Sequence, residues 1–406
     1  MLFVVGAMAA LSIDVVTLYT ARSEAQLAAD GAALAGARAL ANSGLTSSAA
    51  GPIGAEDLAR AVATQVAAKN RVGGRNLNST GACAAGEISV CFNDSATTFG
   101  TNPQVTVKVQ RTDLPTFFAR IWGSQQLTVA ASATAEAYNA SGPNIAGNPR
   151  SPVAPICVKP WLLPNIDPSD STLPPIFDTT SGAYTTTTLL GWQAGNTFRL
   201  RTDCLPAETC TTGSIPYRWR YYPGDPADFP PPASSTVACN GCSFNNYQLS
   251  IAGCIQKPIS CNSTVHIDVT PYIPSGTNRD ADAAVAVDEL THATNSGGGD
   301  SVTTTVPPFQ FLAGSNNPVV SGSTVMVSDS LVTVPVIDTS NWPVGFPAVR
   351  IIGFVQLFLL EFGNPVIGNN HIDTQVINLV GCGTGATGQP ILGNGASPVA
   401  VRLISP

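Results

Sequence analysis

The sequence of residues 12–37 is SIDVVTLYTARSEAQLAADGAALAGA, a stretch without proline in which strong helix formers dominate. It predicts one long helix that continues to about Ala41. Small residues recur every fourth position and so share one ridge, which allows another element to approach the helix backbone closely. The ridge either docks against other helices in or beside a membrane or covers a sheet of the same chain. One ridge contains Ala25, Ala29, Ala33, Ala37 and Ala41, and the ridge beside it contains Ala28, Ala32 and Gly36.

An apolar segment precedes this helix. Residues 2–13 are apolar apart from Ser12, Asp14 interrupts the run, and residues 15–19 continue it. A helix over residues 2–13 covers about 18 Å, which is less than the roughly 30 Å core of a bilayer. Extending the span to residue 19 places Asp14 inside the membrane, which costs roughly 2.5–3.5 kcal/mol. We therefore expect the natural chain to start further upstream, with Asp14 near the point where the helix leaves the membrane.

A cleaved signal peptide is the alternative for this segment, because small residues near Ala7–Ala10 resemble a cleavage site. We favour a retained anchor, since the segment continues without a break into the predicted helix. Arg22 follows the segment and no basic residue precedes it, so the positive-inside rule would place the rest of the chain in the cytoplasm. The ten cysteines argue for the opposite side, because disulfides form in oxidising compartments.

The composition is typical of a turn-rich β-protein. Only 11% of residues are charged, against about 25% in an average soluble protein, while the chain contains 37 Gly and 32 Pro. The formal net charge is −7, and no basic patch is present to neutralise phosphates, which excludes a nucleic-acid binder. Most of the negative charge lies beyond residue 150, so any membrane contact should come from the apolar N-terminus.

Residues 12–37 resemble the N-terminal motif of TadG-like proteins, which belong to the tight-adherence (Flp-type) pilus assembly machinery. The family pattern is roughly A-I-D-x-G-x-x-Y-x-x-R-x-x-L-Q-x-A-A-D-A-A-A-L-A-G-A. Val16 departs from the usual Gly, Ala25 from the usual Leu before Gln, and Gly31 from the usual Ala. A looser resemblance continues to about Tyr138. The residues in register are Asp14, Tyr19, Arg22, Gln26, Asp30, Leu34 and Gly36.

This resemblance implies a structural role without catalysis or a cofactor. The chain would be held in a bacterial inner membrane by a single N-terminal span, with its body in the periplasm or outside the cell. Its partners would be the membrane and other Tad or pilin-like subunits. The rival hypothesis is a secreted β-rich adhesive or carbohydrate-binding protein freed by signal cleavage. The residues that the resemblance selects for helix packing are Asp14, Tyr19, Arg22, Gln26, Ala29, Asp30, Ala33, Gly36 and Ala37.

The expected fold class is α+β, with a long N-terminal membrane or stalk helix and a small α+β domain, followed by a disulfide-rich, mainly-β domain. We predict four parts: residues 1–41, 42–138, a linker over 139–155, and 156–406. The second part should contain helices over 55–70 and 114–122 and strands over 104–110 and 126–138. The last part should contain strands over 265–269, 323–327, 331–337 and 349–360 and a helix over 280–294, with 349–360 as its central strand.

The cysteines are expected to be mostly disulfide-bonded. Cys83 and Cys91 suggest a small loop, and a bridge from Cys157 to Cys382 would close the second domain, although sequence alone does not assign pairs. A zinc site from Cys239-x-x-Cys242 with Cys254 and Cys261 is the alternative, but the second spacing is too long for a usual zinc knuckle. The complete set is Cys83, Cys91, Cys157, Cys204, Cys210, Cys239, Cys242, Cys254, Cys261 and Cys382.

No catalytic constellation is visible in the sequence. The three histidines, His266, His292 and His371, do not have zinc-protease spacing, and Gly-x-Ser-x-Gly is absent. Asp280, Asp282 and Asp300 lie either in a solvated loop or in a calcium site. A cluster of aromatic and arginine residues belongs either to the core or to a surface that contacts a protein or a glycan. The cluster consists of Tyr217, Trp219, Tyr221 and Tyr222 with Arg218 and Arg220.

Overall fold

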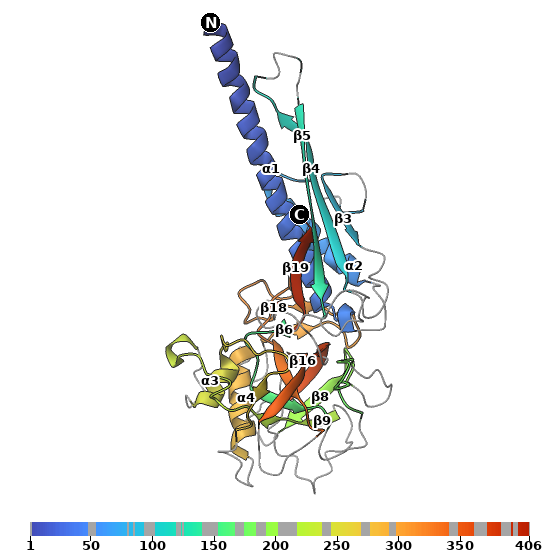
Figure 1. Cartoon of the computed structure of the whole chain (residues 1–406), viewed down its shortest axis with the longest axis vertical. Helices are drawn as coiled ribbons and strands as arrows, with labels where there is room; N and C mark the ends of the chain where they lie inside the picture. The colour runs from blue at the N-terminus through green and yellow to red at the C-terminus, as the bar shows by residue number, and fades with distance from the viewer. Residues whose placement is uncertain are drawn as a thin grey trace. The chain divides into compact units, whose positions relative to one another are not determined.

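The long helix predicted from residues 12–37 is present as α1, Leu2–Asn42. The computed structural model describes residues 2–47, 54–78, 81–83, 86–92, 102–118, 123, 126–139, 153–166, 174–183, 192–201, 217–237, 245–268, 277–291, 298–340, 348–360, 372–382, 391–392 and 397–405. The chain divides into two compact units (Figure 1). The N-terminal unit comprises Met1–Ala41, Gly51–Tyr138 and Val401–Pro406, and the body comprises Asn42–Ala50 and Asn139–Ala400. Neither unit is continuous in sequence, and the four-part domain division stays a prediction.

The N-terminal unit contains a second helix, α2, at Ala55–Lys69, which confirms the helix predicted over 55–70. Acidic Glu56 and Asp57 lie in its first turn and Lys69 in its last, as the helix dipole favours. Its buried side chains are alanines four residues apart, so α2 presents a narrow apolar stripe of small residues. These alanines are Ala55, Ala59, Ala63 and Ala67.

The sheet of the N-terminal unit has the strand order β19-β5-β4-β3. Its inward side chains alternate along β4, where Val105, Val107 and Val109 are fully buried, as the sequence pattern predicts. A two-stranded turn of β1 and β2 precedes the sheet. The strands are β1 Arg71–Val72, β2 Arg75–Asn76, β3 Ile88–Phe92, β4 Gln104–Pro115, β5 Gln126–Tyr138 and β19 Ala400–Ser405.

The helix predicted over 114–122 is wrong at its start. Leu114 and Pro115 continue β4 and pair with Leu127 and Gln126 of β5. A residue before proline avoids the helical region, and this favours the extended form at Leu114. Residues 119–122 lie outside the described residues. The described part of this segment is therefore the end of a long β4–β5 hairpin.

The core of the body is a sheet in the order β10-β7-β15-β16-β17-β8-β9, with β11 paired to β16. The strand predicted over 331–337 is β15, and the one predicted over 349–360 is the central β16, buried along nearly its whole length. Strand β17 was not predicted. The sheet is built from β7 Trp161–Pro164, β8 Thr197–Arg201, β9 Tyr217–Arg220, β10 Tyr222–Pro223, β11 Thr264–Val265, β15 Leu331–Ile337, β16 Val349–Leu359 and β17 Ile372–Gly381.

Shorter elements surround this sheet. The predicted helix over 280–294 is α4, which begins earlier, at Thr277, and ends at Thr291, where the described stretch ends. The strands predicted over 265–269 and 323–327 are reduced to the two-residue β11 and β14. The remaining elements are η1 Leu45–Ser47, β6 Val153–Ala154, η4 Ser234–Thr236, α3 Asn246–Ala252, α4 Thr277–Thr291, β12 Ser301–Val302, β13 Phe311–Leu312, β14 Thr324–Val325 and β18 Ile391–Leu392.

A buried polar cluster attaches residues 42–47 to the body. Thr46 and Ser47 donate their hydroxyls to Oδ1 of Asn378 at 3.2 and 3.4 Å. Asn139 donates its amide to the carbonyl oxygens of Thr46 and Leu379. Because buried polar groups are stabilised by such hydrogen bonds, these residues pack with β17. This explains why the end of α1 belongs to the body.

Three disulfides lie among the described residues: Cys83–Cys91, Cys157–Cys254 and Cys261–Cys382. The first confirms the predicted small loop. The predicted bridge from Cys157 to Cys382 is wrong, because Cys157 pairs with Cys254 and Cys382 with Cys261. The zinc alternative is wrong for Cys254 and Cys261, whose sulfurs are in disulfides. Cys204, Cys210, Cys239 and Cys242 lie outside the described residues. The α+β class, with a long helix and a disulfide-bonded, mainly-β body, is confirmed.

Candidate functional site

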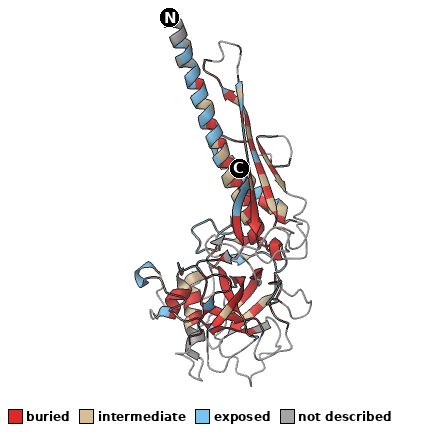
Figure 2. Ribbon diagram, viewed as in Figure 1, coloured by how far each residue is buried: buried red, intermediate tan, exposed pale blue. Residues whose placement is uncertain are grey.

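The candidate site is α1, whose C-terminal half is buried and whose N-terminal half is largely exposed (Figure 2). The alanines of both ridges are fully buried inside the N-terminal unit. A Cβ on Gly36 would lie 3.3 Å from Cβ of Ala63 in α2 and 3.3 Å from the methyl carbons of Val105 in β4. The small ridge therefore covers this chain's own helix and sheet, as the second of the two interpretations predicted. The buried ridge residues include Ala25, Ala28, Ala29, Ala32, Ala33, Ala37 and Ala41.

Polar motif residues tie α1 to the same unit. Gln26 donates its amide to Asp30 Oδ1 at 2.7 Å and to the carbonyl oxygen of Ser132 in β5 at 3.3 Å. Glu24, at a position that the family pattern leaves variable, accepts the backbone N–H of Gly73 at 2.6 Å. The bonds of Gln26 to Ser132 and of Glu24 to Gly73 fix the rotation of α1 within the unit, and Asp30 orients the Gln26 amide.

Asp14 is 5% exposed, although the residues on either side of it are exposed. Its Oδ1 accepts the backbone N–H of Phe117 at 2.9 Å, and its Oδ2 accepts that of Phe118 at 3.0 Å. A hydrogen bond from a backbone N–H to an ionised carboxylate is roughly twice as strong as one between two neutral groups. Asp14 therefore joins α1 to the tip of the β4–β5 hairpin. Sequence reasoning missed Phe117 and Phe118, because nothing in the pattern marks which carboxylate they contact.

The N-terminal half of α1 presents apolar side chains outward. Tyr19 is 75% exposed, and Arg22 is exposed as well. The hydroxyl residues of this stretch direct their oxygens inward to the helix: Thr17 donates to the carbonyl of Ile13 at 2.9 Å and Thr20 to that of Val16 at 3.0 Å. Such bonds hide hydroxyls from an apolar environment. Among the side chains of α1 that the structure describes, the exposed large apolar ones are Met8, Leu11, Ile13, Val15, Val16, Tyr19 and Leu27.

Among the described residues, none of the helices combines the length and the apolarity that a membrane span needs. The same residues contain no cluster of three His, Cys, Asp or Glu side chains suited to a metal ion. Asp282 accepts amide hydrogens from Asn245 and Gln248, whereas Asp300 accepts from Gly314 and Asn317. The two carboxylates thus have separate partners, and the side chain of Asp280 lies outside the described residues.

The aromatic cluster belongs to the core of the body. Trp219 and Tyr221 are buried, and Trp219 packs edge-on against Trp192 with ring centroids 5.3 Å apart. Tyr222 is buried as well. The core interpretation therefore holds for these three residues, and a glycan would not reach them. The side chains of Tyr217 and Arg218 lie outside the described residues.

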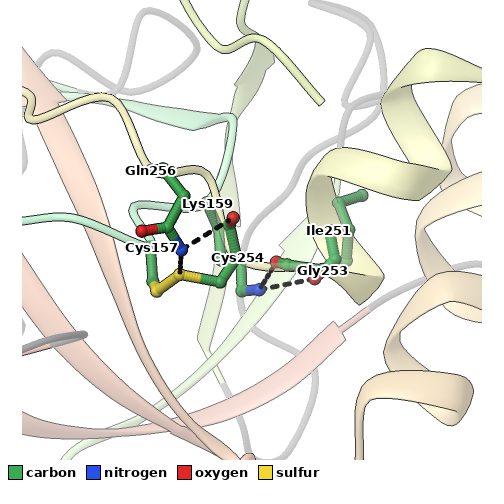
Figure 3. Close-up of a disulfide and its surroundings, with 6 residues drawn as sticks. All are labelled: Cys157, Lys159, Ile251, Gly253, Cys254 and Gln256. Atoms are coloured by element: carbon green, nitrogen blue, oxygen red, sulfur yellow. Dashed lines mark hydrogen bonds between the residues drawn. A yellow bond between two sulfur atoms is a disulfide. The ribbon is translucent and has the colours of Figure 1, made fainter. Parts of the chain in front are cut away.

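A buried cation lies beside the Cys157–Cys254 disulfide (Figure 3). Lys159 is 4% exposed, and its Nζ donates to the carbonyl oxygens of Ile251 and Gly253 at 2.5 and 2.8 Å. These carbonyls close the C-terminal end of α3, where the helix dipole favours a cation. Burial lowers the pKa of Lys159 to about 7, while the charge of Asp329 acts in the opposite direction.

Raising the pH from about 7 toward 10 is expected to increase the free energy of unfolding of the body. The unfolded chain keeps the Lys159 proton up to the usual pKa of 10.5, whereas the folded body releases it at about 7. Urea denaturation at several pH values, followed by tryptophan fluorescence, measures the slope. The Lys159→Met variant is the control, because it cannot titrate and should flatten this dependence. Equal slopes in the two proteins would contradict the prediction.

Residues 1–39 match the model of the family described as "Putative Flp pilus-assembly TadE/G-like". No curated protein and no solved structure matches the chain. The matched segment includes Asp14, Gln26 and Gly36, which contact the hairpin tip, β5 and α2. Three motif residues thus lie where α1 meets the rest of its unit, whereas Tyr19 and Arg22 of the same motif are exposed. The N-terminal segment of the chain, residues 1–39, is therefore similar to that of TadE/G-like Flp pilus-assembly proteins.

Proposed function

We propose that this chain is a non-enzymatic, membrane-anchored component of a Flp/Tad-type pilus assembly or related secretion machinery. The observation that carries the proposal is the family match of residues 1–39, because the match falls on the helix that the apolar segment begins. In this role the N-terminal half of α1 sits in the inner membrane and the body contacts other subunits outside the cytoplasm. The role is structural, and it needs no reaction or cofactor.

The exposed face of α1 is the surface that docks. The alanine ridge is occupied by α2 and β4, so contacts with other membrane helices must use the outward residues. Met8, Leu11, Val15 and Tyr19 follow the i, i+3, i+7 and i+11 spacing of one helical stripe, and all four are exposed. Tyr19, with an apolar ring and a polar hydroxyl, suits the boundary between membrane and water.

The disulfides support a body outside the cytoplasm. Cys157–Cys254 and Cys261–Cys382 join residues 97 and 121 positions apart in the chain. Structural disulfides of this kind persist in oxidising compartments and are rare in the cytosol. They outweigh the positive-inside argument from Arg22, because a body folded in the cytosol would keep these thiols reduced.

Fractionation of cells that make the full chain tests this proposal. We expect the protein in the membrane pellet after washes with high salt and alkaline carbonate, and in solution only after detergent. Protease added to spheroplasts should cleave the body while the cytoplasm stays closed. A mature chain that begins beyond Asp14 and is soluble in the periplasm or medium would favour the secreted adhesive instead. A body protected in spheroplasts but cleaved after lysis would contradict the orientation.

A further inference from the structure

We propose that the tip of the β4–β5 hairpin, Phe117 and Phe118, seats in the lipid bilayer beside α1, and that Asp14 holds it there. The inference rests on the proposed membrane anchoring of α1 and extends it to a second element of the chain. The N-terminal unit would then contact the membrane at two places, the helix and the hairpin tip. Figure 1 shows the β4–β5 hairpin running beside α1 within this unit.

The geometry at Asp14 brings the two elements together. Both carboxylate oxygens accept backbone N–H groups of the tip, from Phe117 and Phe118, at 2.9 and 3.0 Å. Asp14 is the first charged side chain of the sequence, and Arg22 is the next. A carboxylate without hydrogen-bond donors is strongly disfavoured inside a membrane span. The tip lowers this cost, because it supplies donors that replace the water that Asp14 gives up.

The apolar surface around Asp14 is too wide for one protein partner. Leu11 and Ile13 differ by about 200° around the helix axis, and Met8, Val15 and Val16 lie between them on that arc. A helix that packs against one neighbour presents a stripe of about 100°. A second copy of this chain would leave much of the arc in water, whereas lipid chains cover all of it at once. Asp14 lies in the remaining arc, where the hairpin tip covers it.

Phe117 extends this apolar surface onto the hairpin. Its ring is 64% exposed, although its backbone is bonded to a buried carboxylate. A phenylalanine ring held outward beside an apolar helix is more stable in the hydrocarbon of a bilayer than in water. Exposed apolar residues also occur in the body, such as Val320, and they supply a control.

Photocrosslinking of the full-length chain tests the contact. Benzoylphenylalanine is placed at position 117, at position 16 on the apolar face of α1, or at position 320 in the body. Each protein is reconstituted into vesicles of phosphatidylethanolamine and phosphatidylglycerol, irradiated and analysed by mass spectrometry for lipid adducts. We expect lipid adducts from positions 117 and 16, and at least tenfold fewer from 320.

The outcomes separate this inference from the proposed function. Lipid adducts at position 16 without any at 117 would contradict insertion of the hairpin tip into the bilayer, but would agree with membrane anchoring by α1. Adducts at neither position would overturn both. Crosslinks from position 117 to a second copy of the chain in place of lipid would show that the tip is a protein interface, and this result would overturn the inference as well.

The role of Asp14 has its own test. Asp14→Leu is added separately to the position 117 probe and to the position 16 probe. It removes the acceptor while it makes the segment more apolar, so the anchor is retained and the tip is released. We expect lipid adducts at 117 to fall severalfold and adducts at 16 to stay unchanged. Ser12→Leu is the matched control, since it adds the same side chain two positions away and keeps both hydrogen bonds to Asp14. Equal losses in the two variants, or no loss in either, would overturn the role of Asp14.

Discussion

Replacement of Cys261 and Cys382 by alanine is expected to lower the free energy of unfolding of the body by about 4–5 kcal/mol. The bridge joins residues 121 positions apart, so its loss frees a long loop in the unfolded chain. Both cysteines are buried, and Cys382 follows β17 directly. Alanine leaves no polar group in the core. The loss of unfolding free energy should therefore be close to the value expected from the entropy of the freed loop.

Urea denaturation followed by tryptophan fluorescence measures this loss. Of the five tryptophans, Trp161, Trp192 and Trp219 are fully buried in the core of the body, so the change in fluorescence reports mainly on this unit. The matched control is the double alanine variant of Cys83 and Cys91, whose loop spans 8 positions in the N-terminal unit. That loop is worth about 2–3 kcal/mol, and its loss should leave the tryptophan transition of the body in place.

The Cys157–Cys254 bridge gives an independent comparison. Its loop closes before Cys261, so the two large loops do not overlap and their entropic contributions should add. Removal of both bridges is expected to prevent folding of the body at 37 °C. A loss below about 2 kcal/mol on removing Cys261–Cys382 would mean that the unfolded body keeps residual structure that already closes its loop.

The sequence predicts the long helix and α2 well, because both are dense in alanine and free of proline. It does not decide what the alanine ridge touches. Small side chains allow close approach to a membrane helix or to a strand alike, so the contact of Gly36 with Ala63 and Val105 appears only in three dimensions. The hydrogen bonds of Asp14 to the hairpin tip are likewise invisible in one dimension, since 103 positions separate Asp14 from Phe117.

Strand β17 was missed because polar residues interrupt its apolar pattern. Thr374, Gln375 and Asn378 are buried in the strand, and each has a hydrogen-bond partner on another element. Thr374 donates to the carbonyl of Phe198, and the amide of Asn378 donates to Gln356 of β16 at 2.6 Å. Buried polar groups with partners are compatible with a core strand, but their partners cannot be read from spacing. In strand β16, Gln356 is the one buried polar residue, so its apolar run is long enough to predict a strand.

The disulfide pairs could not be predicted for a related reason. The spacing of Cys83 and Cys91 allows a local loop, and this pair forms. Backbone hydrogen bonds outside the local sequence hold the two larger pairs in place: the N–H of Cys157 bonds to the carbonyl of Ile255, next to Cys254, and that of Cys382 to the carbonyl of Ile352 in β16. Such pairing depends on strand order, which the sequence of short, proline-rich segments does not specify.

The substitution Gly36→Leu is expected to destabilise the N-terminal unit by about 3 kcal/mol, near the upper end for overpacking. A Cβ at this position already lies 3.3 Å from Ala63 and Val105, so a longer side chain would push α1 away from α2 and β4. Hydrogen exchange of α2 in the full-length chain, followed by mass spectrometry, measures the change, because α2 is protected only while α1 covers it. The expected result is faster exchange across Ala55–Lys69.

Gly31 supplies the matched control on the same helix. A Cβ there meets only a methyl carbon of Val66, at 4.0 Å, so Gly31→Ala should slow exchange in α2 through a gain in helix propensity of about 1 kcal/mol. Faster exchange of α2 in Gly36→Leu and slower exchange in Gly31→Ala would show that packing within the unit requires glycine at position 36, and that the helix has no general need for glycine. Gly36→Leu could instead leave hydrogen exchange of α2 unchanged while it abolished pilus assembly. That result would mean that the ridge binds another subunit, and that Gly36 is buried against α2 and β4 only when the chain is alone.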